Sequence, residues 1–180
     1  MTSSGVRRAV FLDRDGVINR SPCIDGKPRA PRRLEDFRLL PGTAAAVSAL
    51  KRAGFLAIVV TNQPDVGNGL MTREALDAMH ARLVRTVAVD AVLVCPHRQD
   101  EGCECRKPKP GLIRRAIAQF AIDPSASYLI GDRWSDVAAG KAAVLTTIFL
   151  DRGDAEAKPE RADLVVKSLP QAARVILAKA

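Results

Sequence analysis

The sequence contains few aromatic residues, no long apolar run and no continuous block of basic residues. Its 180 residues include only five Phe, one Trp and one Tyr, so few side chains are available for stacking on nucleic-acid bases. No apolar run approaches the roughly 20 residues that a membrane-spanning helix requires. The apolar run near the N-terminus is too short for a signal peptide. We therefore expect a cytoplasmic protein without membrane association.

Net charge gives weak information about partners. The chain carries a net charge of +8, but its 28 Lys and Arg residues are interspersed among 20 Asp and Glu residues. Scattered charge of this kind is typical of a solvated basic surface and does not favour nucleic acid as a partner. The same positive field would also attract a small phosphorylated substrate. The sequence leaves the oligomeric state open, and a monomer is compatible with it.

The alternation of short apolar runs with amphipathic segments indicates one α/β domain over residues 1–180. Strands are predicted at 10–12, 56–60, 91–94, 128–130, 146–150 and 164–166, and helices at 43–53, 72–87, 112–121, 135–143 and 169–177. Such alternation predicts a doubly wound, mainly parallel sheet with helices on both faces, of Rossmann-like type. The irregular stretches 19–41 and 95–110 are too short for an inserted cap domain, so we expect none.

Polar residues follow four of the predicted strands. In chain order they are Asp13 and Asp15, Thr61 and Asn62, Lys107, and Asp132 and Asp136. Ligands of open α/β sheets bind at the carboxyl ends of the strands, and right-handed crossovers bring all four groups to one edge. Carboxylates gathered in this way require a cation, and their oxygen atoms suit Mg²⁺. Each motif alone would be an ordinary turn or helix cap, but the ordered set predicts phosphoryl transfer.

The spacing of Asp13 and Asp15 has a chemical use. On an extended backbone the two side chains point to the same side, and Arg14 is expected to point away from them. One carboxylate can then attack phosphorus while the other protonates the leaving oxygen. Gly16 permits a sharp turn directly after this pair.

Residues 95–105 hold three of the four cysteines and one of the two histidines, namely Cys95, His97, Cys103 and Cys105. A chain of this size without export signals is not expected to contain a disulfide framework. Four nitrogen and sulfur ligands with no open position predict a structural zinc site, and a catalytic zinc is disfavoured for the same reason. The zinc would pin this loop and thereby fix Arg106 and Lys107. We expect Cys23 to be an inert thiol and His80 to have a packing or surface role.

The motifs together resemble the haloacid dehalogenase superfamily. The resemblance rests on the stretch from Phe11 to Gly16, on Thr61 and Lys107, and on the Gly131-Asp132-x-x-x-Asp136 pattern, and it covers nearly the whole chain. Within the superfamily, the Cys/His loop and the following Cys-Arg-Lys-Pro are similar to the branch of histidinol-phosphate and heptose-bisphosphate phosphatases. The long motif from Asp13 to Asn19, together with Thr61-Asn62-Gln63, favours the heptose side, whose members remove the 7-phosphate of D-glycero-D-manno-heptose 1,7-bisphosphate.

The resemblance implies a role for each matching residue. Asp13 would be the nucleophile that forms an aspartyl-phosphate, and Asp15 the acid/base. Mg²⁺ would be bound by the Asp13 carboxylate, the Asp15 carbonyl and Asp132, with support from Asp136. The transferring phosphoryl group would be held by Thr61 and Lys107, and the substrate would be contacted by Asn62, Arg106 and Arg133.

Two departures from the family pattern concern the substrate rather than the chemistry. After Thr-Asn-Gln the family commonly continues Ser-Gly-Ile-Ala-Arg-Gly, whereas this chain has Pro64-Asp65-Val66-Gly67-Asn68-Gly69, which replaces the arginine with Asn68. Residues 21–30 also differ from the usual substrate loop. These changes leave the sugar and its anomer open.

Three alternatives remain at this point. Two are phosphatases of the same superfamily, acting on histidinol phosphate or on the 3′-phosphate of a nucleic acid. The third is a zinc-containing nucleic-acid-binding module without turnover. It accounts for the net charge of +8 and for the metal loop, but it gives the four aspartates at the strand ends no role.

Overall fold

The computed structural model describes residues 6–24, 27–153 and 157–179, and a parallel sheet forms their centre. Within this part of the chain the sheet has six strands in the order β5-β4-β1-β6-β7-β8. The strands are β1 (Arg8–Leu12), β4 (Phe55–Asn62), β5 (Ala91–Cys95), β6 (Tyr128–Gly131), β7 (Thr146–Leu150) and β8 (Leu164–Val166). The chain runs outward from β1 to β5 and then crosses to β6 on the other side of β1. This change of direction beside β1 is a topological switch point, where ligands of such sheets bind.

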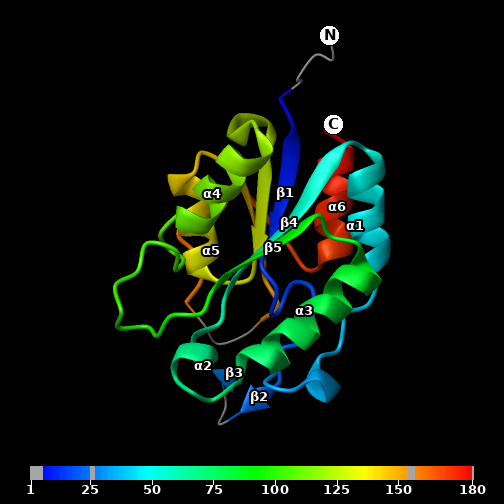
Figure 1. The fold of residues 1–180 in the computed structure, drawn as a ribbon. Coiled ribbons are helices and arrows are strands. Elements are labelled where there is room, and N and C mark those ends of the chain that lie inside the picture. The colour runs from blue at the N-terminus through cyan, green and yellow to red at the C-terminus, as the bar shows by residue number, and fades with distance from the viewer. Residues whose placement is uncertain (1–5, 25–26, 154–156, 180) are drawn as a thin grey trace.

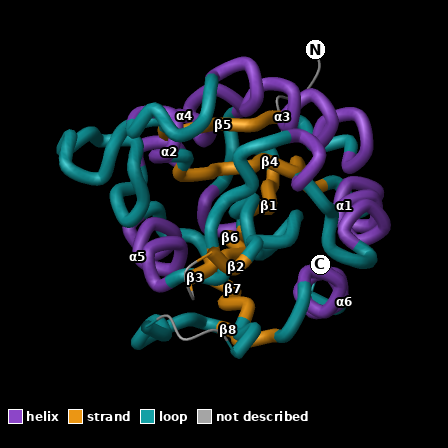
Figure 2. Tube along the Cα trace, turned by 90° about the horizontal axis from the view of Figure 1, so that it is seen from below, coloured by secondary structure: helices purple, strands orange, loops and turns teal. Residues whose placement is uncertain are grey.

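Helices cover both faces of the sheet (Figures 1 and 2). One face is covered by α1 (Thr43–Arg52), α3 (Arg73–Val87) and α6 (Leu169–Leu177), and the other by α4 (Gly111–Phe120) and α5 (Trp134–Ala142). The α/β fold with a parallel sheet and two helical layers is therefore confirmed. Among the described residues, none of the helices has the length and apolar character needed to traverse a membrane.

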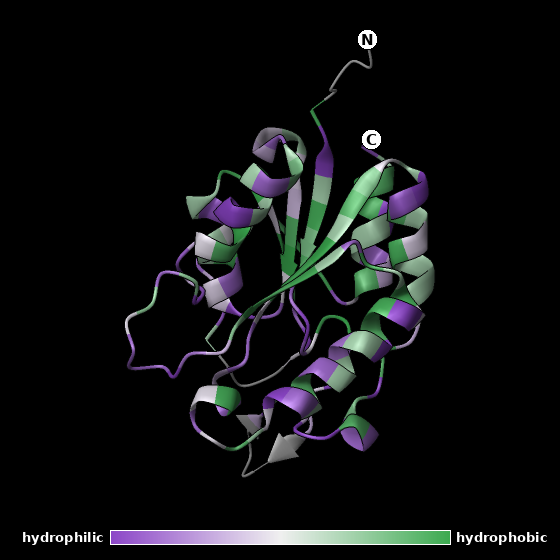
Figure 3. Cartoon of the chain, in the orientation of Figure 1, coloured by the Kyte–Doolittle hydropathy of each residue, from purple (hydrophilic) through white to green (hydrophobic). Residues whose placement is uncertain are grey.

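The two central strands bury side chains on both faces. In β1, Val10 and Leu12 belong to the core under α1, α3 and α6, whereas Ala9 and Phe11 belong to the core under α4 and α5. Residues of β4 alternate between the same two cores. A strand that is buried on both faces has no polar side, which is why residues 9–12 of β1 and 55–60 of β4 are continuous apolar runs. Most of each strand is accordingly green in Figure 3.

The boundaries predicted from apolar periodicity agree closely with the structure. The strands at 146–150 and 164–166 and the helix at 169–177 begin and end where expected. The hydroxyl of Thr72 caps α3 by accepting a hydrogen bond from the Ala75 amide at 3.1 Å, as predicted. Other ends differ by one or two residues; for example, β1 begins at Arg8 and β5 ends at Cys95. Thr61 and Asn62 do not follow β4, as predicted, but end it, because they pair with Val94 and Cys95 of β5.

Short elements lie beside the carboxyl ends of the strands. They are the two-stranded antiparallel ribbon of β2 (Cys23–Ile24) and β3 (Lys27–Pro28), a 3₁₀ turn at Leu34–Asp36, and α2 (Pro64–Gly67). The ribbon and α2 lie below the strand ends in Figure 1. The side chain of Cys23 lies outside the described part of the structure, so its predicted inertness stays a prediction. These elements border the functional edge of the sheet.

Candidate active site

The turn after β1 brings Asp13 close to the end of β6. The Asp13 amide donates a hydrogen bond to the Ile130 carbonyl at 3.0 Å, which continues the pairing between the strands. The next turn residue with a special geometry is Gly16, whose φ is +87° and whose hydrogen points at Asp132. A Cβ at this position would lie 1.8 Å from Asp132 Oδ2. Glycine is therefore required here both for the turn and for the approach of Asp132 to the first strand end.

Asp13, Asp132 and Asp136 form a carboxylate cluster, in which one oxygen of each residue lies within 4.8 Å of the others. Lys107 Nζ is inserted beside this cluster and donates to Asp13 Oδ1 at 2.7 Å, to Asp136 Oδ1 at 2.6 Å and to the Val60 carbonyl at 2.8 Å. Residues separated by more than 90 positions in the chain thus meet at one point, as the order of motifs predicted.

Burial and mutual repulsion shift the titration of this cluster. Burial, opposed by Lys107 and reinforced by Asp136 and Asp15, raises the pKa of Asp13 to about 6. Burial and the charges of Asp13 and Asp136 raise the pKa of Asp132 well above its ordinary value. For Lys107, burial lowers the pKa, but the carboxylates of Asp13 and Asp136 outweigh burial and raise it. Three carboxylates against one ammonium group leave negative charge that a cation would neutralise.

The carboxylate cluster fits a magnesium ion in ligand type. Asp132 Oδ1 is buried and has no hydrogen-bond partner among the described residues, and buried polar atoms without a partner are rare unless an ion or water binds them. Asp136 is more fully occupied, since Oδ1 accepts from Lys107 and Oδ2 accepts from the Arg133 amide at 3.0 Å. Asp13 and Asp132 could therefore offer ligand atoms to a cation, with Asp136 held beside them by Lys107. The Asp15 carboxylate lies outside the cluster, and ligation by its carbonyl stays a prediction.

Arg14 does not point away from Asp15, contrary to the sequence prediction. Its guanidinium folds back and donates to Asp15 Oδ1 from Nε at 3.1 Å and from Nη2 at 2.9 Å, and Nη2 also lies 3.0 Å from Oδ2. The alternation rule applies to residues within a strand, but β1 ends at Leu12, and the long arginine side chain is free to turn. The result is a fully buried arginine that orients the second carboxylate of the motif.

Asn19 and Gln63 complete the surroundings of Asp15 and had no predicted role. The Asn19 amide donates to Asp15 Oδ1 at 2.8 Å, and Gln63 Nε2 lies 2.7 Å from Asp15 Oδ2 and 2.8 Å from Thr61 Oγ1. Both amide side chains are fully buried. The motifs Asp13–Asn19 and Thr61–Gln63 contained both residues, and this was the available signal. Thr61 itself is buried behind the pocket surface, and its contact with a phosphoryl group stays a prediction.

Asn62 contacts the backbone of Lys107, and Arg106 directly precedes Lys107 in the chain. The Asn62 side chain donates to the Lys107 carbonyl and accepts from the Lys107 amide, both at 3.1 Å, so it fixes the lysine backbone. Arg106 Nη1 is buried without a hydrogen-bond partner in the described part of the chain. Both residues line the same pocket as Asp13, which is compatible with the substrate contacts predicted for them.

A pocket of about 470 Å³ opens above the carboxylate cluster. Its floor contains Asp13, Asp15, Lys107 and Asp136, and Asp132 is not among the residues that line it. Further residues that line it are Pro28, Arg29, Ala30, Asn62, Pro64, Asp65, Gln99, Arg106, Pro108, Arg133, Trp134, Ser135 and Ala157. Its walls therefore offer three arginines and the single tryptophan of the chain, which suits a ligand with additional negative charge.

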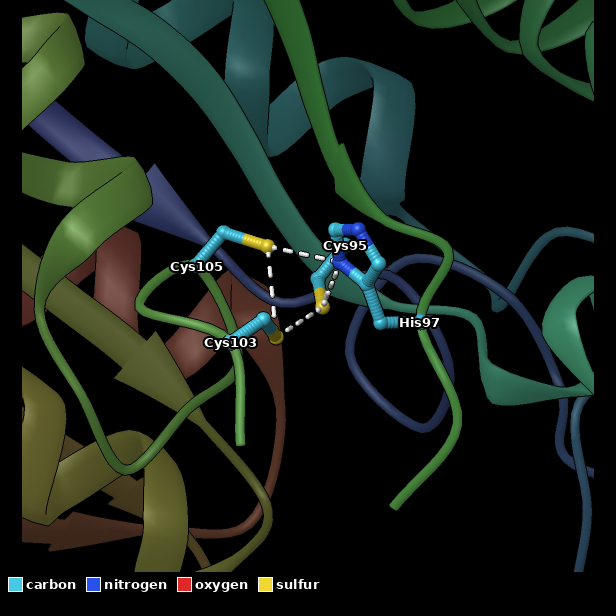
Figure 4. A group of neighbouring side chains, drawn as sticks. All are labelled: Cys95, His97, Cys103 and Cys105. Carbon is cyan, nitrogen blue, oxygen red and sulfur yellow. Dashed lines mark hydrogen bonds between the residues drawn. The ribbon is translucent and has the colours of Figure 1, made fainter. Parts of the chain in front are cut away.

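The four residues of the Cys/His loop converge as predicted (Figure 4). Cys95 Sγ lies 3.6 Å from His97 Nδ1 and 3.5 Å from Cys103 Sγ, and Cys105 Sγ lies 3.2 Å from His97 Nδ1 and 3.5 Å from Cys103 Sγ. Zinc–sulfur bonds of about 2.3 Å in a tetrahedron imply sulfur–sulfur distances of about 3.8 Å. The observed spacing therefore fits a tetrahedral zinc ion. Cys105, the last of the four residues in the chain, directly precedes Arg106 and Lys107.

Comparisons with known proteins place the chain among hydrolases. Residues 104–172 match the family model for HAD-hydrolase-like proteins. The D-glycero-beta-D-manno-heptose-1,7-bisphosphate 7-phosphatase of Pseudomonas aeruginosa is 35% identical over 152 residues, which are 82% of this chain and 83% of that protein. The enzyme of the same name from Rhodopseudomonas palustris is 37% identical over 156 residues, which are 79% and 83% of the two chains.

A solved structure has the same fold. The D,D-heptose 1,7-bisphosphate phosphatase of B. bronchiseptica, complexed with magnesium and phosphate, superposes with a TM-score of 0.86 at 29% identity, over 96% of this chain and 99% of that one. The fold, the strand-end motifs and the similarity over most of the chain lead to one conclusion. The chain belongs to the haloacid dehalogenase-like hydrolase family, and the heptose-bisphosphate phosphatases named above are its relatives.

Proposed function

We propose that this protein is a magnesium-dependent phosphatase that removes the 7-phosphate of D-glycero-D-manno-heptose 1,7-bisphosphate. The observation that carries the proposal is the convergence of Asp13, Lys107, Asp132 and Asp136 at the switch point of the sheet. Phosphoryl transfer requires little besides positioning and neutralisation of charge, and this cluster supplies both. Curated relatives with this activity align over most of the chain.

The reaction follows from the positions of Asp13 and Asp15. An oxygen of Asp13 attacks phosphorus, the bond between phosphorus and the sugar oxygen breaks, and Asp15 gives a proton to the departing sugar oxygen. Water then attacks the phosphorus of the aspartyl-phosphate and gives a proton to Asp15. The bond between phosphorus and the Asp13 oxygen breaks, which releases phosphate and restores the Asp13 carboxylate. Bound to Asp13 and Asp132, Mg²⁺ would neutralise charge on the phosphoryl oxygens. Lys107 Nζ, 2.7 Å from Asp13 Oδ1, lies where it can bind the same oxygens.

The pocket walls support a substrate with a second anionic group. Arg29, Arg106 and Arg133 line the pocket around the floor that contains Asp13. A bisphosphate presents one phosphoryl group to the floor and leaves another for these guanidinium groups, which bind phosphate in a bidentate manner. Trp134 is 48% exposed and lines the same pocket, so it offers an apolar face to a sugar ring.

We further propose that zinc binds to Cys95, His97, Cys103 and Cys105 and has a structural role. The four candidate ligand atoms lie within 4.8 Å of one another. Four nitrogen and sulfur ligands would complete a tetrahedral shell, as in structural zinc sites. Zinc would hold the segment that carries Arg106 and Lys107. The two hydrogen bonds between the Asn62 side chain and the Lys107 backbone would then place the lysine at the carboxylate cluster.

Phosphate release from a panel of substrates tests the proposed function. The panel contains heptose 1,7-bisphosphate in both anomeric forms, histidinol phosphate and a 3′-phosphorylated oligonucleotide, each with and without Mg²⁺. We expect the highest kcat/KM on one heptose anomer and no turnover without the metal. A higher kcat/KM on histidinol phosphate or on the oligonucleotide would reassign the substrate. Salt-sensitive oligonucleotide binding without any phosphate release would favour a binding module instead.

A further inference from the structure

Two buried polar side chains near the active site have no role in the reaction described above. Arg14 is fully buried directly between the two catalytic aspartates of the sequence motif. His80 lies on α3 and is partly buried. A buried charge is costly unless every one of its polar groups is paired, so the partners of Arg14 indicate what holds it in position.

Arg14 connects Asp15 with His80. One side of the guanidinium, formed by Nε and Nη2, contacts the Asp15 carboxylate at 2.9–3.1 Å. The other side, formed by Nη1, lies 3.1 Å from His80 Nε2. The guanidinium carbon also lies 5.7 Å from the centre of the Phe37 ring. Asp15, Arg14 and His80 therefore form a continuous chain from the pocket to α3.

The direction of the last hydrogen bond follows from chemistry. A guanidinium group can only donate, so His80 Nε2 must accept and carries no proton, and the proton of the neutral imidazole is on Nδ1. Burial and the neighbouring Arg14 charge lower the pKa of His80 to about 4, against weaker opposing effects of Asp15 and Asp77. The imidazole is therefore neutral at physiological pH and able to accept this bond.

We propose that His80 is a positioning residue: by accepting a hydrogen bond from Arg14, it holds the guanidinium against Asp15 and thereby fixes the carboxyl group that exchanges protons with the leaving group and with water. This inference rests on the proposed function. Without His80, Nη1 loses its acceptor in a buried environment, and the arginine gains freedom to shift. Displacement of a proton donor by a fraction of an ångström reduces its contribution to the rate.

Three variants separate positioning from simple packing. His80→Leu removes the acceptor and replaces the imidazole with an apolar side chain of similar size. His80→Gln retains an acceptor oxygen near the position of Nε2. Met79→Ala creates a cavity in the main core one residue away on the same helix, so it lowers stability without changing the acceptor.

The readout is kcat/KM on two phosphate esters with different leaving groups. The quantity kcat/KM reports the steps up to the formation of the aspartyl-phosphate. A sugar phosphate needs a proton on its departing alcohol oxygen, whereas p-nitrophenyl phosphate releases a stable phenolate without one. For His80→Leu we expect kcat/KM to fall about tenfold or more on heptose 1,7-bisphosphate and to change less than about threefold on p-nitrophenyl phosphate. His80→Gln should recover most of the loss, and Met79→Ala should keep the wild-type ratio of the two values.

The possible results discriminate clearly. Equal losses on both esters without recovery in His80→Gln would show a purely structural role and overturn the inference. Unchanged values in a folded His80→Leu protein would do the same. If the wild type hydrolyses p-nitrophenyl phosphate and the His80 variants show no defect, only the role of His80 is contradicted. Wild-type protein inactive on both esters with Mg²⁺ contradicts the proposed function, and the inference falls with it.

A spectroscopic measurement does not depend on turnover. The chain has only two histidines, so nitrogen-15 spectra of histidine-labelled protein are readily assigned with the His80→Gln variant. We expect His80 in the neutral form with its proton on Nδ1, and this signal should be preserved in Met79→Ala. A proton on Nε2 at neutral pH would exclude acceptance from Arg14 and overturn the proposal.

Discussion

The carboxylate cluster and the Cys/His loop are built in opposite ways. The carboxylate cluster gathers Asp13 from the end of β1, Asp132 from the end of β6 and Asp136 from the first turn of α5, and the buried sheet fixes their positions. The Cys/His loop draws all its ligand atoms from residues 95–105, of which only Cys95 belongs to a strand. The first site exists because the fold brings distant residues together. The second site lies in a loop that packs few apolar side chains, and zinc binding would order this loop. They meet at Lys107, which follows the loop and enters the carboxylate cluster.

The largest effect is expected from a change in the carboxylate cluster. Asp13→Asn removes the nucleophile while keeping the size of the side chain, and Lys107 retains its ion pair with Asp136. We expect turnover to fall by a factor of about 10³ or more with the fold preserved. Mg²⁺-dependent phosphate release and circular dichroism measure the two properties.

The control for this variant is Asp77→Asn, which removes an exposed carboxylate that pairs with Arg73 on α3. It should retain the fold and wild-type turnover, because exposed ion pairs contribute little to the free energy of unfolding. Full activity in Asp13→Asn would show that the strand-end cluster has another purpose and would remove the contrast between the two sites.

An intermediate effect is expected from the Cys/His loop. Cys105→Ser should abolish zinc binding, lower Tm by about 5–10 °C and reduce kcat roughly tenfold, because Arg106 and Lys107 lose a fixed anchor. The wild type should contain about one zinc ion per chain by atomic emission spectrometry. Cys23→Ser, a change outside this loop, should preserve zinc content, Tm and activity. A zinc-free Cys105→Ser protein with wild-type kcat would show that the sheet alone positions Lys107.

A smaller effect concerns the pH dependence of stabilisation by Mg²⁺. The pKa of Asp13 in the folded protein, about 6, lies above its ordinary value of 3.8. Between these values the folded state binds protons more tightly than the unfolded chain, so without metal this group's contribution to stability falls as pH rises. A cation competes with those protons. We therefore expect the rise in Tm caused by Mg²⁺ to be larger at pH about 7 than at pH about 5.

The comparison with and without Mg²⁺ at each pH cancels groups remote from the metal, including His80. Differential scanning fluorimetry provides the Tm values, and Asp132→Asn should flatten the response because it removes a proposed ligand. An equal rise at both pH values would mean that Mg²⁺ does not replace protons on this cluster.

Features with local signals could be predicted from the sequence. Apolar periodicity placed the helices and strands, and the order of the strand-end motifs placed Asp13, Lys107, Asp132 and Asp136 at one edge. The elements that were not predicted are short: α2, β2 and β3 contain too few residues to show a periodic pattern. Their positions depend on contacts with the rest of the fold.

The surroundings of Asp15 show the limit of sequence reasoning most clearly. Arg14 was expected to point away, but it turns back because its long side chain finds Asp15 and His80 as buried partners. Asn19 and Gln63 were visible in the motifs, yet nothing in their spacing indicated that both amides would contact one carboxylate. Such contacts depend on side-chain directions that only the assembled core determines.

The smallest expected effect concerns the walls of the pocket. The Cys/His loop supplies Gln99 to one side of the pocket, and Arg106 follows the loop directly. An ion pair at 2.7 Å between Arg32 and Asp65 holds another part of the wall. The Arg32 side chain is 35% exposed, so a double-mutant cycle of Arg32→Gln and Asp65→Asn should give a coupling of only about 0.5–1 kcal/mol in urea unfolding. The same variants should raise KM for the heptose bisphosphate a few-fold while kcat changes little, because they loosen a wall and leave the carboxylate cluster intact. A loss of kcat as large as that of Cys105→Ser would mean that the ion pair, like the proposed zinc ion, positions the catalytic residues.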